Sequence, residues 1–255
     1  MPLTIATVPC LADNYAYLAH DVATGATAVI DVPDAPPILN ALRERGWRAS
    51  HILITHHHDD HIAGVRALAA ATGARVIGAA ADAHRLPRLD EAVAEGDLVR
   101  IGLAEGRVIA VPGHTTGHVA YHFAESRAAF TGDSLMALGC GRVFEGTMAQ
   151  MWESLTRLAA LPPETLIHSG HEYSQSNARF ALTIEPDNAA LRRRAEEIAA
   201  LREAGRPTVP VPLSLELATN PFLRAGRPEL RQALGMGEAD PAEVFAEIRR
   251  RKDRF

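Results

Sequence analysis

Residues 55–61 (THHHDDH, Thr55 to His61) place four imidazoles and two carboxylates within seven residues. A single metal ion could not accept so many ligands from one loop. Histidine and carboxylate without thiolate are the ligands of hydrolytic zinc, manganese or iron sites, whereas structural zinc sites usually draw on cysteines. The stretch therefore predicts a metal centre with a chemical role.

The apolar run before this stretch predicts a strand over residues 51–55, and the run after it predicts a helix. His56 and His58 are two residues apart at the end of the strand, where alternation turns both side chains to one side and the histidine between them to the other. Asp60 and His61 follow the turn into the helix and face another direction. One loop can therefore supply half of the ligands of two neighbouring ions.

Further candidate ligands follow other predicted strands. His114, Asp133 and His171 each come directly after a glycine, which allows a tight backbone turn at a crowded site. Loops at strand ends are where α/β proteins place their chemistry. Because a carboxylate can bridge two cations, Asp133 is the natural shared ligand.

A lone histidine is more often an ordinary core or surface residue than a ligand. We interpret six histidines in this way: His20, His51, His84, His118, His122 and His168. Within the stretch, His57 and Asp59 are expected to be replaceable. A solvated polar loop is the alternative interpretation of residues 55–61, but the later ligands at strand ends favour a metal site.

Short β-branched runs alternate with helical patterns from residue 26 to about residue 170, which predicts an α/β layered domain. The expected strands are residues 27–31, 51–55, 107–111, 119–123, 128–131 and 165–168, and the expected helices are residues 36–45, 63–72 and 148–160. Later, long charged helical patterns replace the strands. We therefore expect a catalytic domain over residues 1–172 and a smaller helical domain over residues 173–255.

The composition is that of a protein with a sizeable core, because 47% of the 255 residues are apolar and 22% are charged. No apolar run is long enough to span a bilayer, and residues 1–9 lack the basic start of a signal peptide. The net charge of −5 argues against a general affinity for nucleic acid. Two cysteines, Cys10 and Cys140, are too few for a disulfide scaffold, so we expect a cytoplasmic protein. We also expect a monomer with neither nucleic-acid nor membrane partners.

The stretch THHHDDH resembles the T-H-x-H-x-D-H signature of the metallo-β-lactamase superfamily, with the later ligands named above and Asp31 as the early strand-end aspartate. Within that superfamily the chain is similar to the glyoxalase II (hydroxyacylglutathione hydrolase) family over essentially its full length. Four segments carry the narrower resemblance: GCGRVFEGT (139–147), GHEY (170–173), NPFLR (220–224) and RKDRF (251–255).

The resemblance implies an αββα sandwich, with two mixed β-sheets between helices, and a smaller all-helical C-terminal domain. It implies two divalent metal ions, zinc with iron or manganese as alternatives. The implied ligands are His56, His58 and His114 for the first ion, Asp60, His61 and His171 for the second, and Asp133 for both. Asp60 and Asp133 would also act in catalysis together with a metal-bound hydroxide.

The family hydrolyses S-(2-hydroxyacyl)glutathione thioesters, such as S-D-lactoylglutathione, to glutathione and a 2-hydroxy acid (D-lactate) in methylglyoxal detoxification. The resemblance implies that Arg142, Tyr173, Arg249 and Lys252 contact glutathione. Lys252 is the only lysine among 26 basic residues, and guanidinium and ammonium groups suit a carboxylate. Phe144 occupies the position at which some members carry a tyrosine whose hydroxyl contacts the thiol, so weaker binding of glutathione is expected.

This chemistry fits the ligand set. Two ions about 3.5–4 Å apart can share a water and lower its pKa towards neutrality, which gives a hydroxide nucleophile. The thiolate leaving group needs little help from an acid, because its parent thiol has a pKa of about 8.5. The chain has no Gly-x-Ser-x-Gly segment, so covalent serine catalysis has no support.

Other functions share the signature. One alternative is another thioester hydrolase of this fold or a persulfide dioxygenase-like enzyme with one iron, although such dioxygenases lack the helical domain and the K-D-x-F ending. A nuclease should show an inserted domain and a basic surface, and a β-lactamase should carry a signal peptide. The non-enzymatic alternative is a binding protein clipped by a metal, but a structural clip needs only four closed ligands.

Overall fold

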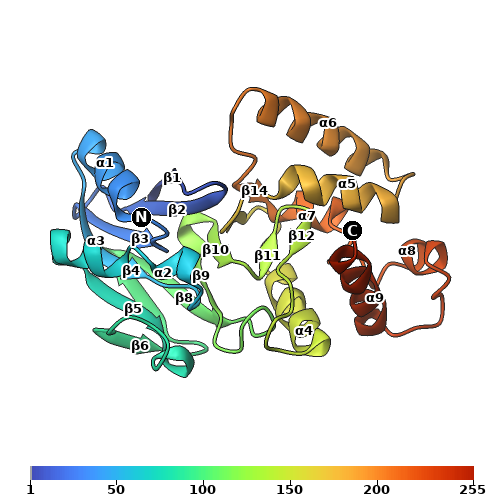
Figure 1. The fold of residues 1–255 in the computed structure, drawn as a ribbon, viewed down its shortest axis with the longest axis horizontal. Helices are drawn as coiled ribbons and strands as arrows, with labels where there is room; N and C mark the ends of the chain where they lie inside the picture. The colour runs from blue at the N-terminus through green and yellow to red at the C-terminus, as the bar shows by residue number, and fades with distance from the viewer. Residues whose placement is uncertain (1) are drawn as a thin grey trace.

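Two six-stranded mixed β-sheets form the centre of the computed structural model, which describes residues 2–255 (Figure 1). The first sheet has the order β1-β2-β3-β4-β5-β6: β1 (Thr4–Cys10), β2 (Asn14–His20), β3 (Ala26–Ile30), β4 (Arg48–Leu53), β5 (Arg75–Ala79) and β6 (Glu91–Val93). Its strands are antiparallel from β1 to β3 and parallel from β3 to β6.

The second sheet has the order β14-β13-β10-β9-β8-β7. Its strands are β7 (Leu98–Ile101), β8 (Ala104–Ala110), β9 (Val119–Phe123), β10 (Ala128–Gly132), β13 (Leu166–Ser169) and β14 (Val211–Pro212). The strands β8, β10 and β13 run in the same direction, because β9 is antiparallel to both of its neighbours and β13 is parallel to β10. Their carboxyl ends therefore meet at one edge of the sheet.

Helices cover the sandwich and build the C-terminal part (Figure 1). They are α1 (Ala35–Arg45), α2 (Asp59–Ile62), α3 (Val65–Thr72), α4 (Met148–Ala159), α5 (Ser174–Ile184), α6 (Ala189–Glu203), α7 (Leu213–Thr219), α8 (Pro228–Ala233) and α9 (Pro241–Asp253). Single 3₁₀ turns lie at Ala80–Asp82 and Ala124–Ser126. The expected sandwich and helical C-terminal part are confirmed. The C-terminal part also contributes one strand, the two-residue β14, to the second sheet.

The core has two main layers of apolar side chains. One fills the space between the sheets, where Tyr17 from β2 packs with Phe130 from β10. The other lies between the first sheet and the helices α1 and α3, around Ile38 and Leu68. Burial of such side chains stabilises the fold by about 1.5–3 kcal/mol each. The sandwich is thus held from both faces of the first sheet.

The N-terminal hairpin β1–β2 was not predicted, and it reaches the edge of the second sheet. The N–H of Tyr15 donates to the carbonyl of Gly170 at 2.8 Å, and the N–H of Glu172 donates to the carbonyl of Asp13 at 2.8 Å. The hairpin therefore ties the first sheet to the segment that follows β13.

A small hairpin of the N-terminal part, β11 (Leu135–Met136) with β12 (Gly139–Cys140), inserts into the C-terminal helices. Its tip residue Leu138 has a φ of 56° and is fully buried against α5 and α6. The buried carboxylate of Glu216 accepts from the N–H of Leu138 at 3.0 Å and pairs with Arg194. Removing one partner of such a buried pair typically costs about 3–5 kcal/mol. Arg194 therefore holds Glu216 firmly in the position from which it accepts from the hairpin.

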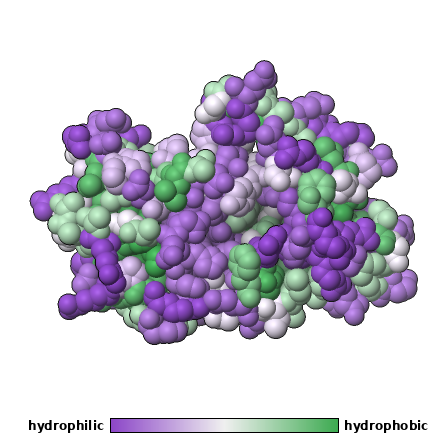
Figure 2. All heavy atoms as spheres, viewed as in Figure 1, coloured by the Kyte–Doolittle hydropathy of each residue, from purple (hydrophilic) through white to green (hydrophobic). Residues whose placement is uncertain are grey.

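Hydrophilic side chains dominate the face shown in Figure 2, and hydrophobic ones form small separate groups on it. Within residues 2–255, none of the helices combines the length and the apolar character needed to cross a bilayer.

Candidate active site

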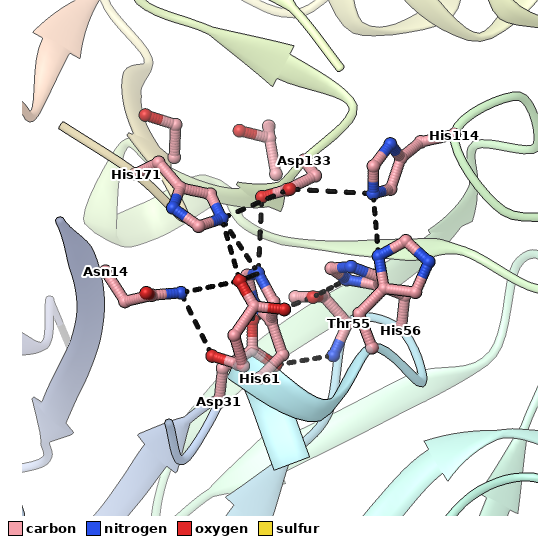
Figure 3. A network of polar contacts seen from close by, with 12 residues as sticks. Asn14, Asp31, Thr55, His56, His61, His114, Asp133 and His171 are labelled. Carbon is pink, nitrogen blue, oxygen red and sulfur yellow. Dashed lines mark hydrogen bonds and ion pairs between the residues drawn. The ribbon is translucent and has the colours of Figure 1, made fainter. Parts of the chain in front are cut away.

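The loop that carries residues 55–61 is held by Asp31, which follows β3 with a φ of 55° (Figure 3). The N–H and the hydroxyl of Thr55 both donate to the Asp31 carboxylate at 2.8 Å. The same carboxylate lies 2.9 Å from Nδ1 of His61. Asp31 therefore fixes both ends of the loop and turns the other ring nitrogen of His61 toward the site.

Three histidines from two loops form a first group of donors. The donor atoms of His56, His58 and His114 all lie within 4.8 Å of one another. Nδ1 of His114 lies 2.7 Å from the carbonyl oxygen of Arg142, so this nitrogen donates and Nε2 is left as a lone-pair donor. His57 faces away, with Nδ1 at 3.2 Å from Asp82. The predicted opposite directions of His57 and its neighbours are confirmed, although these residues follow β4 rather than continue it.

A second group joins Asp60, His61 and His171, whose donor atoms also lie within 4.8 Å. Asp133 lies between the two groups, since its Oδ2 is 3.5 Å from Nε2 of His114 and 3.3 Å from Nε2 of His171. A further overlapping group consists of His56, His61 and Asp133. This arrangement, seen in Figure 3, is what a carboxylate shared by two cations requires.

Burial and charge shift the pKa values of the histidines in opposite directions in the two donor groups. Burial and the neighbouring imidazoles hold the pKa of His56 well below its usual range, so this ring stays neutral and can donate a lone pair. Although burial opposes it, hydrogen bonds to Asp133 and Asp60 raise the pKa of His171 to about 11. The contact with His171 in turn lowers the pKa of Asp60. The carboxylates thus favour positive charge beside His171, as a cation site demands.

Two buried polar atoms at the centre of the site lack a hydrogen-bond partner among residues 2–255: Nε2 of His56 and Oδ1 of Asp133. Buried polar atoms are normally paired, so unpaired donor atoms inside a ligand cluster point to a bound group. Imidazoles and carboxylates without thiolates suit zinc, iron or manganese. The residues present therefore fit a pair of divalent metal ions.

Three supporting residues were missed in the sequence. Asn14 donates through Nδ2 to Oδ2 of Asp60 at 3.0 Å, and Oδ1 of Asp13 lies 3.1 Å from Nδ1 of His171. His118, interpreted as an ordinary residue, belongs to none of the donor groups, but it stacks on the ring of His56 and its Nε2 accepts from a backbone N–H of the site at 3.1 Å. All three orient candidate ligands.

A cavity of about 380 Å³ opens beside these groups and contains all four predicted glutathione contacts, Arg142, Tyr173, Arg249 and Lys252. The ring of Tyr173 stacks on a candidate ligand, His171, with ring centroids 4.6 Å apart. Arg142 is half-exposed, and its guanidinium lies over the ring of Phe144. The structure brings the four residues together from both parts of the chain.

The basic end of α9 contributes two of these residues in different ways. Arg249 is buried, donating to the carbonyl of Cys140 at 2.9 Å and pairing with Asp253 at 2.8 Å. Lys252 lies over the rings of Phe180 and Phe255, and burial together with nearby arginines lowers its pKa to about 8. Arg249 therefore also holds the hairpin β11–β12 in place, whereas Lys252 has a loosely held ammonium group.

A larger cavity, of about 590 Å³, lies near the end of α5 and α8. It is lined by one charged pair, in which Arg224 donates hydrogen bonds of 2.8–3.1 Å to Glu185. None of the donor groups found within residues 2–255 lies there. The smaller cavity beside the donors is thus the candidate active site.

Comparisons with solved structures define the class of protein. The chain resembles the B3 metallo-beta-lactamase BLEG-1, with a TM-score of 0.67 at 20% identity, over 86% of this chain and 99% of that one. It also resembles ETHE1 from Myxococcus xanthus, with a TM-score of 0.59 at 30% identity, over 89% of this chain and all of that one. Residues 16–171 match the family model described as "Metallo-beta-lactamase superfamily". The fold is that of this superfamily.

Sequence comparisons narrow the assignment. Residues 172–255 match the model described as "Hydroxyacylglutathione hydrolase C-terminus". Proteins named hydroxyacylglutathione hydrolase from Cereibacter sphaeroides and Ruegeria pomeroyi are 68% and 61% identical to this chain, each over 100% of both sequences. The chain belongs to the hydroxyacylglutathione hydrolase family of thioester hydrolases.

The contact between Asp13 and His171 predicts a defined loss of metal affinity. Because the side chain of Asp13 is only partly buried, Asp13→Ala should leave the fold intact but release the ring of His171, and the affinity for the more weakly bound ion should fall by roughly 10- to 100-fold. Competition with a chelator measures this affinity. Asp13→Asn, which keeps an acceptor oxygen, should lose less, and Asp187→Ala, at an exposed turn, serves as the control. An unchanged affinity in Asp13→Ala would contradict the assigned role.

Proposed function

We propose that the chain hydrolyses S-(2-hydroxyacyl)glutathione thioesters, such as S-D-lactoylglutathione, to glutathione and D-lactate, as a step of methylglyoxal detoxification. One observation carries the proposal: candidate metal ligands and cationic side chains line the same cavity of about 380 Å³. A thioester carbonyl can meet the first kind of group while a carboxylate of the same molecule meets the second. The names of the full-length relatives support this substrate.

The donor groups would hold two divalent ions: His56, His58 and His114 the first, Asp60, His61 and His171 the second, with Asp133 bridging them. When bound, such a pair supplies a water of lowered pKa and a Lewis acid for the carbonyl. Zinc is the metal we propose, with iron or manganese as alternatives. One similar solved structure, 26% identical with a TM-score of 0.62, is titled as a di-iron-bound form.

Asp60 is the residue best placed to handle a proton. Its carboxylate is half-exposed, lines the cavity and stays ionised, since contacts with His171 and Asn14 lower its pKa. One of its oxygens, Oδ2, is already held by Asn14. Asp60 can therefore orient the attacking water while it serves as a ligand. The departing thiolate needs no dedicated acid, because its parent thiol ionises at a pKa of about 8.5.

The glutathione part would lie against the C-terminal part of the chain. Arg142, Tyr173, Arg249 and Lys252 line the cavity, and their guanidinium and ammonium groups suit the carboxylates of glutathione. We therefore assign catalysis to residues 1–172 and substrate binding mainly to residues 173–255. We further propose that the enzyme works as a monomer in the cytoplasm, without nucleic-acid or membrane partners.

Turnover of S-D-lactoylglutathione tests the proposed substrate. Metal-loaded protein should consume the thioester and release D-lactate and free thiol in equal amounts. Asp133→Asn replaces the carboxylate between the donor groups with a neutral amide and should reduce kcat by at least about 100-fold, as loss of a main electrostatic group does. If the metal-loaded wild type left the thioester intact, the assignment of this substrate would be wrong.

Lys252 predicts a distinctive pH dependence. With its pKa near 8, its ammonium form is complete well below pH 8 and is lost as the pH rises through that value. The ratio kcat/KM, which follows ionisations of the free enzyme, should therefore decline above about pH 8. Lys252→Arg keeps its charge and should remove this decline, whereas Lys252→Ala should raise KM by roughly 10- to 100-fold at pH 7 with little change in kcat.

Arg250 provides the matched control for these variants. It lies in the same helical turn as Lys252, but it is half-exposed and pairs with Glu247 at 3.3 Å. Arg250→Ala should keep both the KM and the pH profile of the wild type. A decline above pH 8 that persists in Lys252→Arg would assign it to another group.

A further inference from the structure

Glu145 accepts an unusual number of hydrogen bonds for a side chain in a loop. Its Oε2 accepts from the N–H of Thr116 at 2.9 Å, from the hydroxyl of Thr116 at 3.1 Å and from Arg85 at 3.1 Å. Its Oε1 accepts from Arg85 at 2.5 Å and lies 3.4 Å from Nε2 of His57. Hydrogen bonds from Arg85 lower the pKa of Glu145 to about 2, so the carboxylate stays charged.

Arg85 and His57 connect this carboxylate to a second, buried one. Arg85 also donates to Asp82, whose side chain is almost fully buried, and Asp82 lies 3.2 Å from Nδ1 of His57. Gly117 packs directly on the Asp82 carboxylate, where a Cβ atom would come within 2.2 Å. We call these five side chains, His57, Asp82, Arg85, Thr116 and Glu145, the Glu145 network.

The Glu145 network borders both loops of the first donor group. His57 directly precedes His58, and Thr116 follows His114 by two residues. The ring of Phe144, next to Glu145, lies with its centroid 5.9 Å from that of His58 and 5.4 Å from that of His114. The network therefore connects the two ligand loops to the segment that carries Phe144.

That segment, residues 141–147, is held at its start by the carbonyl oxygen of Arg142, which lies 2.7 Å from Nδ1 of His114, and by the N–H of Gly141, which donates to Ser134 at 3.2 Å. It belongs to no helix or strand, and Arg142 and Phe144, its cavity-lining side chains, are both more than half exposed. Two backbone hydrogen bonds to residues 113 and 114 fix it from one side, both longer than 3.0 Å. Its charged contacts are the pair of Arg142 with Asp253 at 3.3 Å, on the side of α9, and those of Glu145, so Glu145 supplies the charged contacts between this cavity wall and the two ligand loops.

We propose that Glu145 is a positioning residue that holds residues 141–147 against the two ligand loops, so that Arg142 and Phe144 form a fixed wall for the glutathione part of the substrate. This inference rests on the proposed function for its substrate, but not for its structural content. Glu145 touches neither the cavity nor a candidate ligand side chain. Replacement of Glu145 should therefore change KM more than kcat.

Glu145→Gln and Arg85→Gln test the proposal in the metal-loaded enzyme. Each replacement removes the charge but keeps a polar side chain, so each should raise KM for S-D-lactoylglutathione by about tenfold and change kcat by less than about threefold. Because the two residues act as one contact, the double variant should be no worse than about either single one. Glu105→Gln, which breaks the exposed pair with Arg100 on another face, should behave as the wild type.

Hydrogen exchange of the backbone amides of residues 142–147 provides a readout that needs no substrate. In the metal-loaded protein, these amides should exchange at least about tenfold faster in Glu145→Gln than in the wild type, while amides of the strands keep their protection. Unchanged exchange in both variants, or equal losses in kcat and kcat/KM, would overturn the positioning role. Absence of thioester turnover in the wild type would instead refute the proposed function, and the exchange result would still decide the role of Glu145.

Discussion

The carboxylate of Asp133 is the contact on which the organisation of the site depends. It follows β10 and faces histidines of both donor groups, His114 and His171, at 3.3–3.5 Å. Desolvation and mutual repulsion oppose positive charge on imidazoles gathered in a buried place unless negative charge lies beside them. Asp133 and Asp60 supply that charge. The same electrostatics that stabilise the cluster also make it a site for cations.

Three strands of the second sheet and one of the first bring these residues together. Because β8, β10 and β13 run in the same direction, the loops after them open at one edge, and the loop after β4 meets them there. The C-terminal helices then close the cavity from the other side. The inserted hairpin β11–β12 and the buried Arg249 link the two parts, so the substrate wall and the metal ligands are placed by one connected set of contacts.

The sequence predicted the parts of this arrangement that have a local pattern. Alternation and strand ends were sufficient to separate His56 and His58 from Asp60 and His61, and family resemblance supplied the sandwich. The supporting contacts had no such pattern. Asn14 meets Asp60 across 46 residues, and it lies on a hairpin that was not predicted. His118 follows Gly117, as the candidate ligands His114 and His171 follow glycines, but this local feature does not distinguish a ligand from a residue that supports one.

Contacts between distant charged groups were equally invisible. Arg85 and Glu145 are 60 residues apart, and each lies outside any regular element. His57 was expected to be replaceable because it faces away from the ligands, yet that direction is what brings it to Asp82. A pattern of two or three residues can predict the direction of a side chain, but not the partner that it meets after the chain has folded.

Calorimetric titration of the metal-free chain with Zn²⁺, with thioester hydrolysis measured on the same samples, tests whether the site works with two ions. We expect saturation at two ions per chain, with hydrolysis that rises as the second ion binds, because Asp133 faces both donor groups. Saturation and full activity at one ion per chain would contradict this expectation.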